Sequence, residues 1–315
     1  MKWLLVSGAA VLLLITGGCG SQWQRQVMVY KTVDGVDLQV EVHDDPNRDV
    51  QATLLWLHGG ALMHGDRSSV PEDEIGWWVG RGYRVAVMDY RLAPETELPG
   101  ILEDLRDAWT WLHERGPSLG VDPARLVLVG QSAGGFLALS GGQRLRPAPA
   151  AVVTLYGFGR ASGDWLSRKA PDCADAPGTG AVRSGLGAPG VGARTRRSAL
   201  SVDSRQRGQW TADILGDTCP DLEDACVRSF NPLDHVTPDF PPTMLIHGEQ
   251  DQDVPVDESR RMADALKGQG VEHEFLTLAR RAHGFDTHGV DDPVVQHALS
   301  RAERFVALVL RGRGR

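Results

Sequence analysis

Alternating apolar and polar residues mark the first regular stretch of the chain, residues 27–43. Valine or leucine recurs at every second position over most of this stretch, and Asp34-Gly35 interrupts the alternation near its middle. A period of two is typical of a β-strand with one buried face, and Asp-Gly is typical of a two-residue hairpin turn. The pattern therefore predicts an antiparallel β-hairpin.

Short apolar runs and longer stretches with helical spacing alternate through the rest of the chain. The short runs predict buried strands at 53–57, 84–88, 126–129, 151–155, 243–247 and 273–278. Apolar residues three or four positions apart predict helices at 101–115, 256–267 and 293–310. Such alternation is typical of an α/β fold with a mostly parallel central sheet, helices on both faces and the hairpin at one edge.

Residues 176–208 break this pattern. They are rich in glycine, alanine, serine and arginine, contain no aromatic residue, and contain a single acidic residue, Asp203. Such a composition offers little apolar surface to bury, so we expect a flexible segment. It lies within a cap-like insertion of about residues 160–230, in a domain that spans residues 20–315.

The N-terminus differs in kind from the rest of the chain. Lys2 is followed by a mainly apolar stretch over residues 3–15 and then by Thr16-Gly17-Gly18-Cys19, which is typical of an export signal. It resembles a bacterial lipoprotein signal. The resemblance implies a signal peptide over residues 1–18, a lipid on Cys19, and an exported protein anchored to a membrane, facing the periplasm or on the outer membrane. Plain secretion and an uncleaved anchor are the alternatives.

The net charge restricts the classes of partner that we expect, and the cysteine content restricts the possible disulfide bonds. A net charge of −8 over 315 residues argues against a nucleic-acid partner, which would need a cationic surface, and no pattern indicates the oligomeric state. An exported protein permits disulfides, and three cysteines remain if Cys19 carries lipid. Cys219 and Cys226 are close in sequence and form the preferred pair, while pairings with Cys173 stay open.

The most informative motif is Gly130-Gln131-Ser132-Ala133-Gly134, which lies between two apolar runs. A strand, a tight turn and a helix in this order expose a serine hydroxyl at the carboxyl end of the strand. The helix that begins behind the serine presents free N–H groups to developing negative charge. This context predicts a nucleophile elbow with Ser132 as the nucleophile.

A serine nucleophile requires a base and an orienting acid, and candidates for both follow late strands of the predicted sheet. Asp251 comes after the strand at 243–247, at the end of the sheet where α/β folds gather their ligands, with Asp253 as the competitor. His283 stands in a glycine-containing loop after the last predicted strand, with His288 as the competitor. The order serine, aspartate, histidine is the one that accompanies a nucleophile elbow.

A small-residue loop after the strand at 53–57 predicts an oxyanion site. It reads Leu57-His58-Gly59-Gly60-Ala61, and backbone N–H groups on such a loop can face a developing negative charge. We expect the amides of Gly60 and Ala61 to act together with that of Ala133, which follows the serine. We expect His58 to stabilise the loop rather than to titrate in catalysis.

Together these motifs resemble those of the α/β-hydrolases of the hormone-sensitive-lipase-like esterase group. Within that group the nearest pattern is that of bacterial carboxylesterases assigned as acetylxylan and feruloyl esterases. The matching pieces are His58-Gly59-Gly60, residues 89–95, 130–135 and 234–238, and the loops that hold Asp251 and His283.

The resemblance implies an α/β-hydrolase fold and a serine carboxylesterase that hydrolyses small-molecule esters through an acyl-enzyme. Ser132, Asp251 and His283 would be catalytic, and no metal or organic cofactor is expected. An amidase such as an arylformamidase, or a peptidase, is the alternative with the same fold. A surface lipoprotein without catalytic activity is the alternative from a different class.

Overall fold

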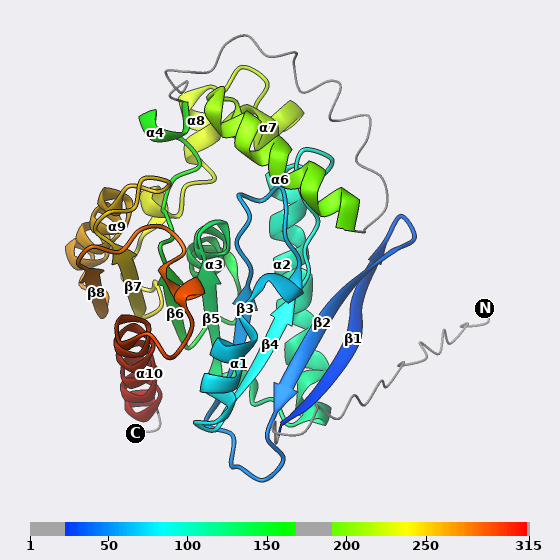
Figure 1. The fold of residues 1–315 in the computed structure, drawn as a ribbon, viewed down its shortest axis with the longest axis vertical. Helices are drawn as coiled ribbons and strands as arrows, with labels where there is room; N and C mark the ends of the chain where they lie inside the picture. Colours follow the sequence, from blue (N-terminus) through cyan, green and yellow to red (C-terminus); the bar gives the residue numbers. More distant parts are fainter. Residues whose placement is uncertain (1–22, 168–190, 314–315) are drawn as a thin grey trace.

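A computed structural model describes residues 23–167 and 191–313, and its centre is an eight-stranded sheet (Figure 1). The strands are β1 (Gln24–Val33), β2 (Val36–Asp44), β3 (Ala52–Leu57), β4 (Tyr83–Met88), β5 (Leu126–Gln131), β6 (Ala151–Leu155), β7 (Thr243–Gly248) and β8 (His273–Leu278). Their order across the sheet is β1-β2-β4-β3-β5-β6-β7-β8. The β1–β2 and β2–β4 pairs are antiparallel, and every other pair is parallel. The predicted mostly parallel sheet with an antiparallel hairpin at one edge is confirmed.

The hairpin turn forms at the predicted Asp34-Gly35. Val33 pairs with Val36, and the two residues between them have positive φ, 51° at Asp34 and 77° at Gly35. Two consecutive positive φ values give a turn whose twist matches the right-handed twist of the flanking strands. The sequence of the turn therefore sets the register of the hairpin.

Helices cover both faces of the sheet and bury it between two apolar layers. The helices on one face are α2 (Leu98–Glu114), α3 (Ala133–Arg144) and α9 (Val256–Gly268), and those on the other are α1 (Glu72–Val79) and α10 (Pro293–Arg313). Leu55 and Leu57 of β3 join the first layer, and Leu54 and Trp56 join the second. Because both faces are covered, every residue of β3 to β7 is buried, which explains their continuous apolar sequences.

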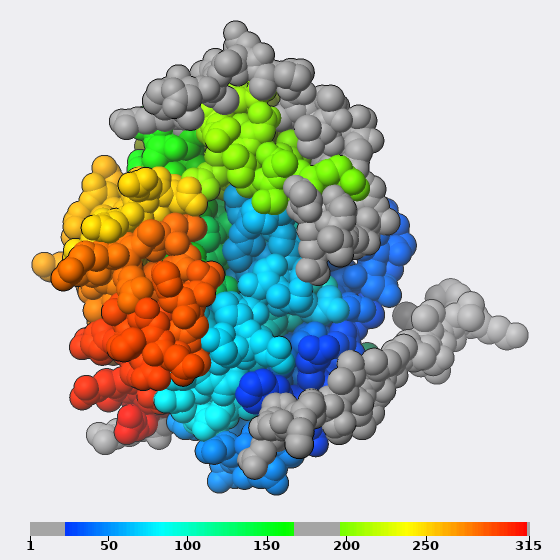
Figure 2. Space-filling view, viewed as in Figure 1, coloured from blue at the N-terminus to red at the C-terminus, as the bar shows by residue number. Residues whose placement is uncertain are grey.

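Between β6 and β7 the chain leaves the sheet and forms a helical insertion over one end of it (Figure 1). In the space-filling view, the green and yellow-green surface of this insertion lies in the upper part of the view (Figure 2). The α-helices described within it are α4 (Asp164–Ser167), α6 (Val191–Gln206), α7 (Trp210–Leu215) and α8 (Asp224–Arg228).

Helix α6 corrects the expectation that residues 176–208 form a flexible segment. One leucine, Leu200, is fully buried, and Arg197 and Arg205 form ion pairs with carboxylates outside the insertion. The composition gave no sign of this helix because Leu200 is the only buried apolar side chain over residues 196–206, where the side chains are described, and the charged partners of the helix are distant in sequence. Residues 176–190 of the segment lie outside the described part of the chain.

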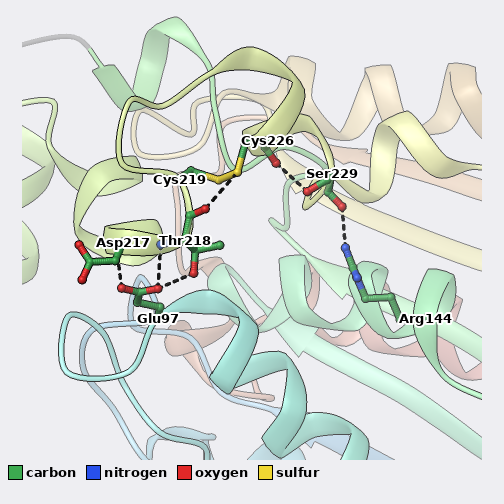
Figure 3. Close-up of a disulfide and its surroundings, with 7 residues drawn as sticks. All are labelled: Glu97, Arg144, Asp217, Thr218, Cys219, Cys226 and Ser229. Atoms are coloured by element: carbon green, nitrogen blue, oxygen red, sulfur yellow. Dashed lines mark hydrogen bonds between the residues drawn. A yellow bond between two sulfur atoms is a disulfide. The ribbon is translucent and has the colours of Figure 1, made fainter.

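The insertion contains a disulfide between Cys219 and Cys226, whose Cα atoms are 5.9 Å apart (Figure 3). This confirms the preferred pairing. The predicted signal peptide with Cys19, and also Cys173, lie outside the described residues. Among the residues that the structure describes, no helix is long and apolar enough to span a bilayer.

Candidate active site

Ser132 occupies a sharp turn between β5 and α3. Its φ of 53° and ψ of −117° are a strained combination for a residue with a side chain. Glycines make the turn possible, because a Cβ at Gly130 would collide with the carbonyl group of Gly134, and a Cβ at Gly134 with that of Leu57. The amide of Ser132 donates to the carbonyl oxygen of Leu155 in β6 at 2.9 Å, which holds the turn against the neighbouring strand.

The structure brings Ser132, His283 and Asp251 into one hydrogen-bonded line. Nε2 of His283 lies 2.9 Å from Oγ of Ser132, and Nδ1 of His283 lies 2.7 Å from Oδ2 of Asp251. An ionised carboxylate only accepts, so Nδ1 carries the proton and Nε2 is left to accept the serine hydroxyl. This arrangement can abstract a proton from the serine.

The two competing residues are placed elsewhere. The carboxylate of Asp253 accepts a hydrogen bond from Arg205 of α6 at 2.9 Å. His288 is exposed at the end of the short helix η6 (Phe285–His288). Of the alternatives that the sequence left open, the structure therefore joins Asp251 and His283 to the serine.

The carboxylate of Asp251 is held on both oxygens. Oδ1 accepts the amides of Asp253 and Val254, both at 2.9 Å, and Oδ2 faces His283 and Nε2 of His247, the latter at 3.2 Å. Burial by itself would raise the pKa of Asp251, but the hydrogen bonds from His247 and His283 outweigh it and lower that pKa. No sequence motif marked His247, which lies near the end of β7, four residues before Asp251.

The predicted oxyanion loop lies directly against the nucleophile. A Cβ at Gly59 would stand 3.2 Å from the carbonyl oxygen of Gln131 and 3.4 Å from Cβ of Ser132, so a side chain there would crowd the backbone of the nucleophile turn. Within residues 23–167 and 191–313, the amides of Gly60, Ala61 and Ala133 donate to no other group. Ala133 is the first residue of α3, so its N–H has no partner within the helix. Three unpaired amides are thus available near Ser132.

His58 stabilises the oxyanion loop through its ring and its carbonyl group. Its Nδ1 donates to the carbonyl oxygen of Gly59 at 2.7 Å, and its ring stacks on Tyr90 with the centroids 4.1 Å apart. The Tyr90 hydroxyl donates to the carbonyl oxygen of His58 at 2.7 Å. Burial lowers the pKa of His58 to about 4, so the ring stays neutral near pH 7.

A buried polar network connects the histidine loop to the nucleophile strand. The hydroxyl of Tyr156 donates to Oδ1 of Asp286 at 2.6 Å, while Gln131, the residue before Ser132, donates its amide to Oδ2 of the same carboxylate. The Tyr156 ring also packs edge-on against His283, with the centroids 4.6 Å apart. Asp286 therefore ties the histidine loop to the turn that carries the serine. No motif in the sequence marked Tyr156 or Asp286.

A second buried carboxyl group, that of Glu74 in α1, lies near this network without a hydrogen-bond partner among the described residues. Burial, reinforced by the negative charges of Asp286 and Asp73, raises the pKa of Glu74 well above its usual value. The folded protein therefore keeps a proton on Glu74 that the unfolded chain releases.

Glu74→Gln is expected to stabilise the protein relative to wild type increasingly as the pH rises above 4.5, the ordinary pKa of a glutamate. Below that pH both states of the wild type hold the proton. Above it only the folded state does, so the contribution of Glu74 to wild-type stability falls by about 1.4 kcal/mol per pH unit until the folded pKa is reached. Urea unfolding between pH 4 and pH 8 measures this. Glu72→Gln, at an exposed position of the same helix, is the control, and a pH-independent difference between Glu74→Gln and wild type would contradict the prediction.

No group of three or more histidine, cysteine, aspartate or glutamate side chains in the described ranges is arranged to hold a metal ion.

Two family models match the chain. The model described as "alpha/beta hydrolase fold" matches residues 54–184, and that of the prolyl oligopeptidase family matches residues 197–306. Ser132 falls within the first match, and Asp251 and His283 fall within the second.

Several known proteins are similar to parts of the chain. It is 38% identical to ethyl acetate hydrolase of Pseudomonas putida over 135 residues, which are 40% of this chain and 42% of that protein. It is 28% identical to non-reducing polyketide synthase Preu6 of Preussia isomera over 309 residues, covering 84% of this chain and 14% of the synthase. The chain thus spans less than half the length of these curated relatives.

The fold has a close counterpart among solved structures. Esterase 2 of Thermogutta terrifontis with butyrate bound superposes with a TM-score of 0.65 at 22% identity, covering 90% of this chain and 94% of that one. At this level of identity the likeness establishes the fold.

Proposed function

Because the chain belongs to the α/β-hydrolases, we propose that it is a serine carboxylesterase that acts on small-molecule esters with short acyl chains. The observation that carries the proposal is the hydrogen-bonded line of Ser132, His283 and Asp251 beside three unpaired amides. A nucleophile, a base, an orienting acid and donors for an oxyanion are the parts that acyl transfer requires.

In the first half of the reaction Ser132 attacks the ester carbonyl carbon. Nε2 of His283 takes the hydroxyl proton, and the amides of Gly60, Ala61 and Ala133 stabilise the oxyanion of the tetrahedral intermediate. The intermediate collapses to an acyl-enzyme as the imidazolium passes its proton to the leaving alcohol. Asp251 keeps the proton on Nδ1 and stabilises the charged ring.

In the second half a water molecule takes the place of the alcohol. His283 removes a proton from the water, which attacks the acyl carbon, and the second tetrahedral intermediate uses the same amides. Its collapse returns the proton to Oγ of Ser132 and releases the carboxylic acid. All of these steps use side chains and amides of this chain.

The names of two similar proteins support a preference for esters with short acyl chains, and one family match supports a different reaction. One is named ethyl acetate hydrolase, and the other, esterase 2 of Thermogutta terrifontis, has been solved with propionate and with butyrate bound. The prolyl oligopeptidase match over residues 197–306 favours a peptidase or amidase as the second candidate. Both candidates use the same nucleophile and differ in the leaving group.

A substrate panel separates these candidates. We expect hydrolysis of p-nitrophenyl acetate and butyrate to exceed that of the octanoate ester, and to exceed that of matched p-nitroanilides and proline-containing peptides by at least about 100-fold. We also expect a fluorophosphonate probe to label Ser132, with the site located by mass spectrometry. Preferred anilide or peptide cleavage would favour the second candidate. Absence of both hydrolysis and labelling would favour a surface lipoprotein without catalytic activity.

We further propose that the chain is an exported lipoprotein held on a membrane by lipid on Cys19. The support is Lys2, the apolar stretch over residues 3–15 and the small residues before the cysteine. In a bacterial host fed radiolabelled palmitate, the wild type is expected to carry label and to partition into detergent. Cys19→Ala is expected to lose the label, while the matched control Cys173→Ala keeps it. An unlabelled wild type found in the medium would instead indicate plain secretion.

A further inference from the structure

The insertion contacts the oxyanion loop through Trp210, the first residue of α7. The indole Nε1 donates a hydrogen bond to the carbonyl oxygen of Ala61 at 2.8 Å, and Trp210 is only 1% exposed. We propose that Trp210 is a positioning residue for the oxyanion donors, so that the insertion takes part in catalysis. The proposal rests on the esterase function proposed above and deepens it, because it assigns a role to a residue outside the catalytic line.

The loop that Trp210 contacts has an unfavourable backbone conformation. The angle φ is 111° at Gly60, 52° at Ala61 and 61° at Leu62. Residues with a Cβ rarely adopt positive φ, and such strain persists only where surrounding contacts over-determine the conformation. The positions of the Gly60 and Ala61 amides therefore depend on the contacts that hold this loop.

The carbonyl groups of the loop show where these contacts come from. The carbonyl oxygen of Gly60 accepts two amides from within the loop, both at 2.9 Å, and that of Leu62 accepts the amide of Ala93 at 2.8 Å. The carbonyl of Ala61 lies between them and is bonded by Trp210. No other donor among the described residues reaches the Ala61 carbonyl, so the indole is what restrains the Ala61–Leu62 peptide group. This peptide group shares the Cα of Ala61 with the preceding one, which carries the N–H of Ala61, so holding it fixes ψ of Ala61 and limits rotation of that N–H.

Trp210 is itself held in place at the start of α7. Its ring packs edge-on against Phe158, with the centroids 5.7 Å apart. The next residue, Thr211, donates its hydroxyl to the carbonyl oxygen of Ala161 at 2.9 Å. Phe158 and Ala161 both belong to the segment that directly follows β6, so the beginning of α7 is attached to the part of the insertion where the chain leaves the sheet.

The far end of α7 is attached to the core of the domain. The carboxylate of Glu97, the residue before α2, accepts the amides of Asp217 at 2.7 Å and Thr218 at 3.1 Å (Figure 3). The disulfide of Cys219 and Cys226 follows at once and joins this turn to α8 (Figure 3). With both ends attached, α7 can hold the indole against the loop.

Loss of the indole donor would release the Ala61–Leu62 peptide group, and relaxation of the positive φ at Ala61 would then move the adjoining Ala61 amide. The oxyanion forms only after Ser132 attacks, so a displaced amide weakens binding of the transition state and leaves binding of the ester unchanged. Removal of a whole oxyanion donor typically costs about 10²- to 10³-fold in kcat, and a displaced donor costs part of that. We expect a fall in kcat of about 10- to 100-fold with KM nearly constant.

The test compares two tryptophan-to-phenylalanine variants with wild type. Trp210→Phe keeps an aromatic ring against Phe158 but removes the N–H donor. Trp165→Phe is the matched control, because Trp165 packs against the same Phe158 at 5.3 Å and its Nε1 bonds to no group in the described part of the chain. For p-nitrophenyl butyrate, Trp210→Phe is expected to lower kcat as stated, and Trp165→Phe to change it less than about threefold.

A trifluoromethyl ketone gives a second readout. Ser132 adds reversibly to its carbonyl carbon, His283 takes the hydroxyl proton, and the resulting oxyanion requires the same amides. Its inhibition constant is expected to rise in Trp210→Phe in proportion to the loss of kcat. A KM increase with unchanged kcat, or equal losses in both variants, would overturn the proposal, because it would indicate a general packing role.

A second variant covers the case in which Trp210→Phe does not fold. Replacing the Trp210 indole with a benzothiophene through site-specific incorporation of 3-benzothienylalanine preserves the ring shape and removes only the N–H. A loss of kcat is expected here as well, and full activity overturns the proposal. If the wild type neither hydrolyses esters nor reacts with the fluorophosphonate, the proposed function itself fails. If the wild type is active and the Trp210 variants are fully active, the positioning role of Trp210 is refuted and the proposed esterase function stands.

Discussion

Ser132→Ala is expected to lower kcat for p-nitrophenyl butyrate by about six orders of magnitude. The hydroxyl lies 2.9 Å from Nε2 of His283 and is the group to which the acyl chain would be bonded. Without it, hydrolysis depends on direct attack by water, aided only by substrate binding and the oxyanion amides. Steady-state rates of the purified proteins, corrected for spontaneous hydrolysis, give the comparison.

Ser140→Ala is the matched control for this variant. Ser140 lies in α3, eight positions after the nucleophile, is fully buried, and its hydroxyl has no hydrogen-bond partner within the described ranges. The same chemical change there removes no hydrogen bond, so kcat should stay within about twofold of wild type. If Ser132→Ala retained wild-type activity, the proposed mechanism would be wrong whatever the substrate.

Asp251→Asn is expected to lower kcat by about 10⁴-fold while the protein keeps its fold. Oδ1 must continue to accept the amides of Asp253 and Val254, which leaves the asparagine NH₂ group facing His283. An NH₂ group donates, so Nδ1 of the imidazole must become the acceptor and the ring proton moves to Nε2. In that tautomer the histidine cannot take a proton from Ser132.

Asp253→Asn tests the alternative that the sequence left open. Its side chain bonds to Arg205 at 2.9 Å, and the carbonyl oxygen of the same residue also accepts from Arg205 at 3.0 Å, so the backbone contact survives the substitution. We expect less than about a tenfold change in kcat. A larger loss in Asp253→Asn than in Asp251→Asn would reverse the assignment of the acid. Circular dichroism of both variants excludes loss of the fold as the cause.

Local sequence patterns were sufficient for the elements around the nucleophile. The apolar run of β5, the small residues at 130 and 134 and the start of α3 are adjacent in the chain, and their geometry follows from short-range sterics. The hairpin at Asp34-Gly35 follows for the same reason, because the turn residues and the alternation together set its register.

The sequence reduced the catalytic acid and the catalytic base to two candidates each but did not decide between them. Two aspartates follow β7 within three residues of each other, and two histidines follow β8 within six residues of each other. Each pair offers the same chemistry at nearly the same place. The decision depends on contacts from elsewhere: Arg205 of the insertion engages Asp253, and Tyr156 and Asp286 hold the loop of His283.

The insertion was the least predictable part. The composition of residues 176–208 indicates a flexible segment, since Leu200 is the only buried apolar side chain over residues 196–206, the part of α6 whose side chains the structure describes. The partners that order it lie in loops after β4 and β7, 48 or more residues away along the chain from the arginines that bind them. Trp210 carried no signal of its role, because a tryptophan followed by a short helix is indistinguishable from ordinary packing until Ala61 lies beside it.

Short-range rules thus account for the strands along the chain, for helices α2, α3, α9 and α10, for the sharp turn at the serine and for the glycine-bearing loop that faces it. These features follow from steric limits and apolar periodicity within windows of a few residues. Which side chains meet at the serine, how α6 is ordered and what restrains the Ala61 peptide depend on contacts between distant segments. Those contacts form only when the sheet has closed in its non-sequential order and brought loops from separate strands to one edge.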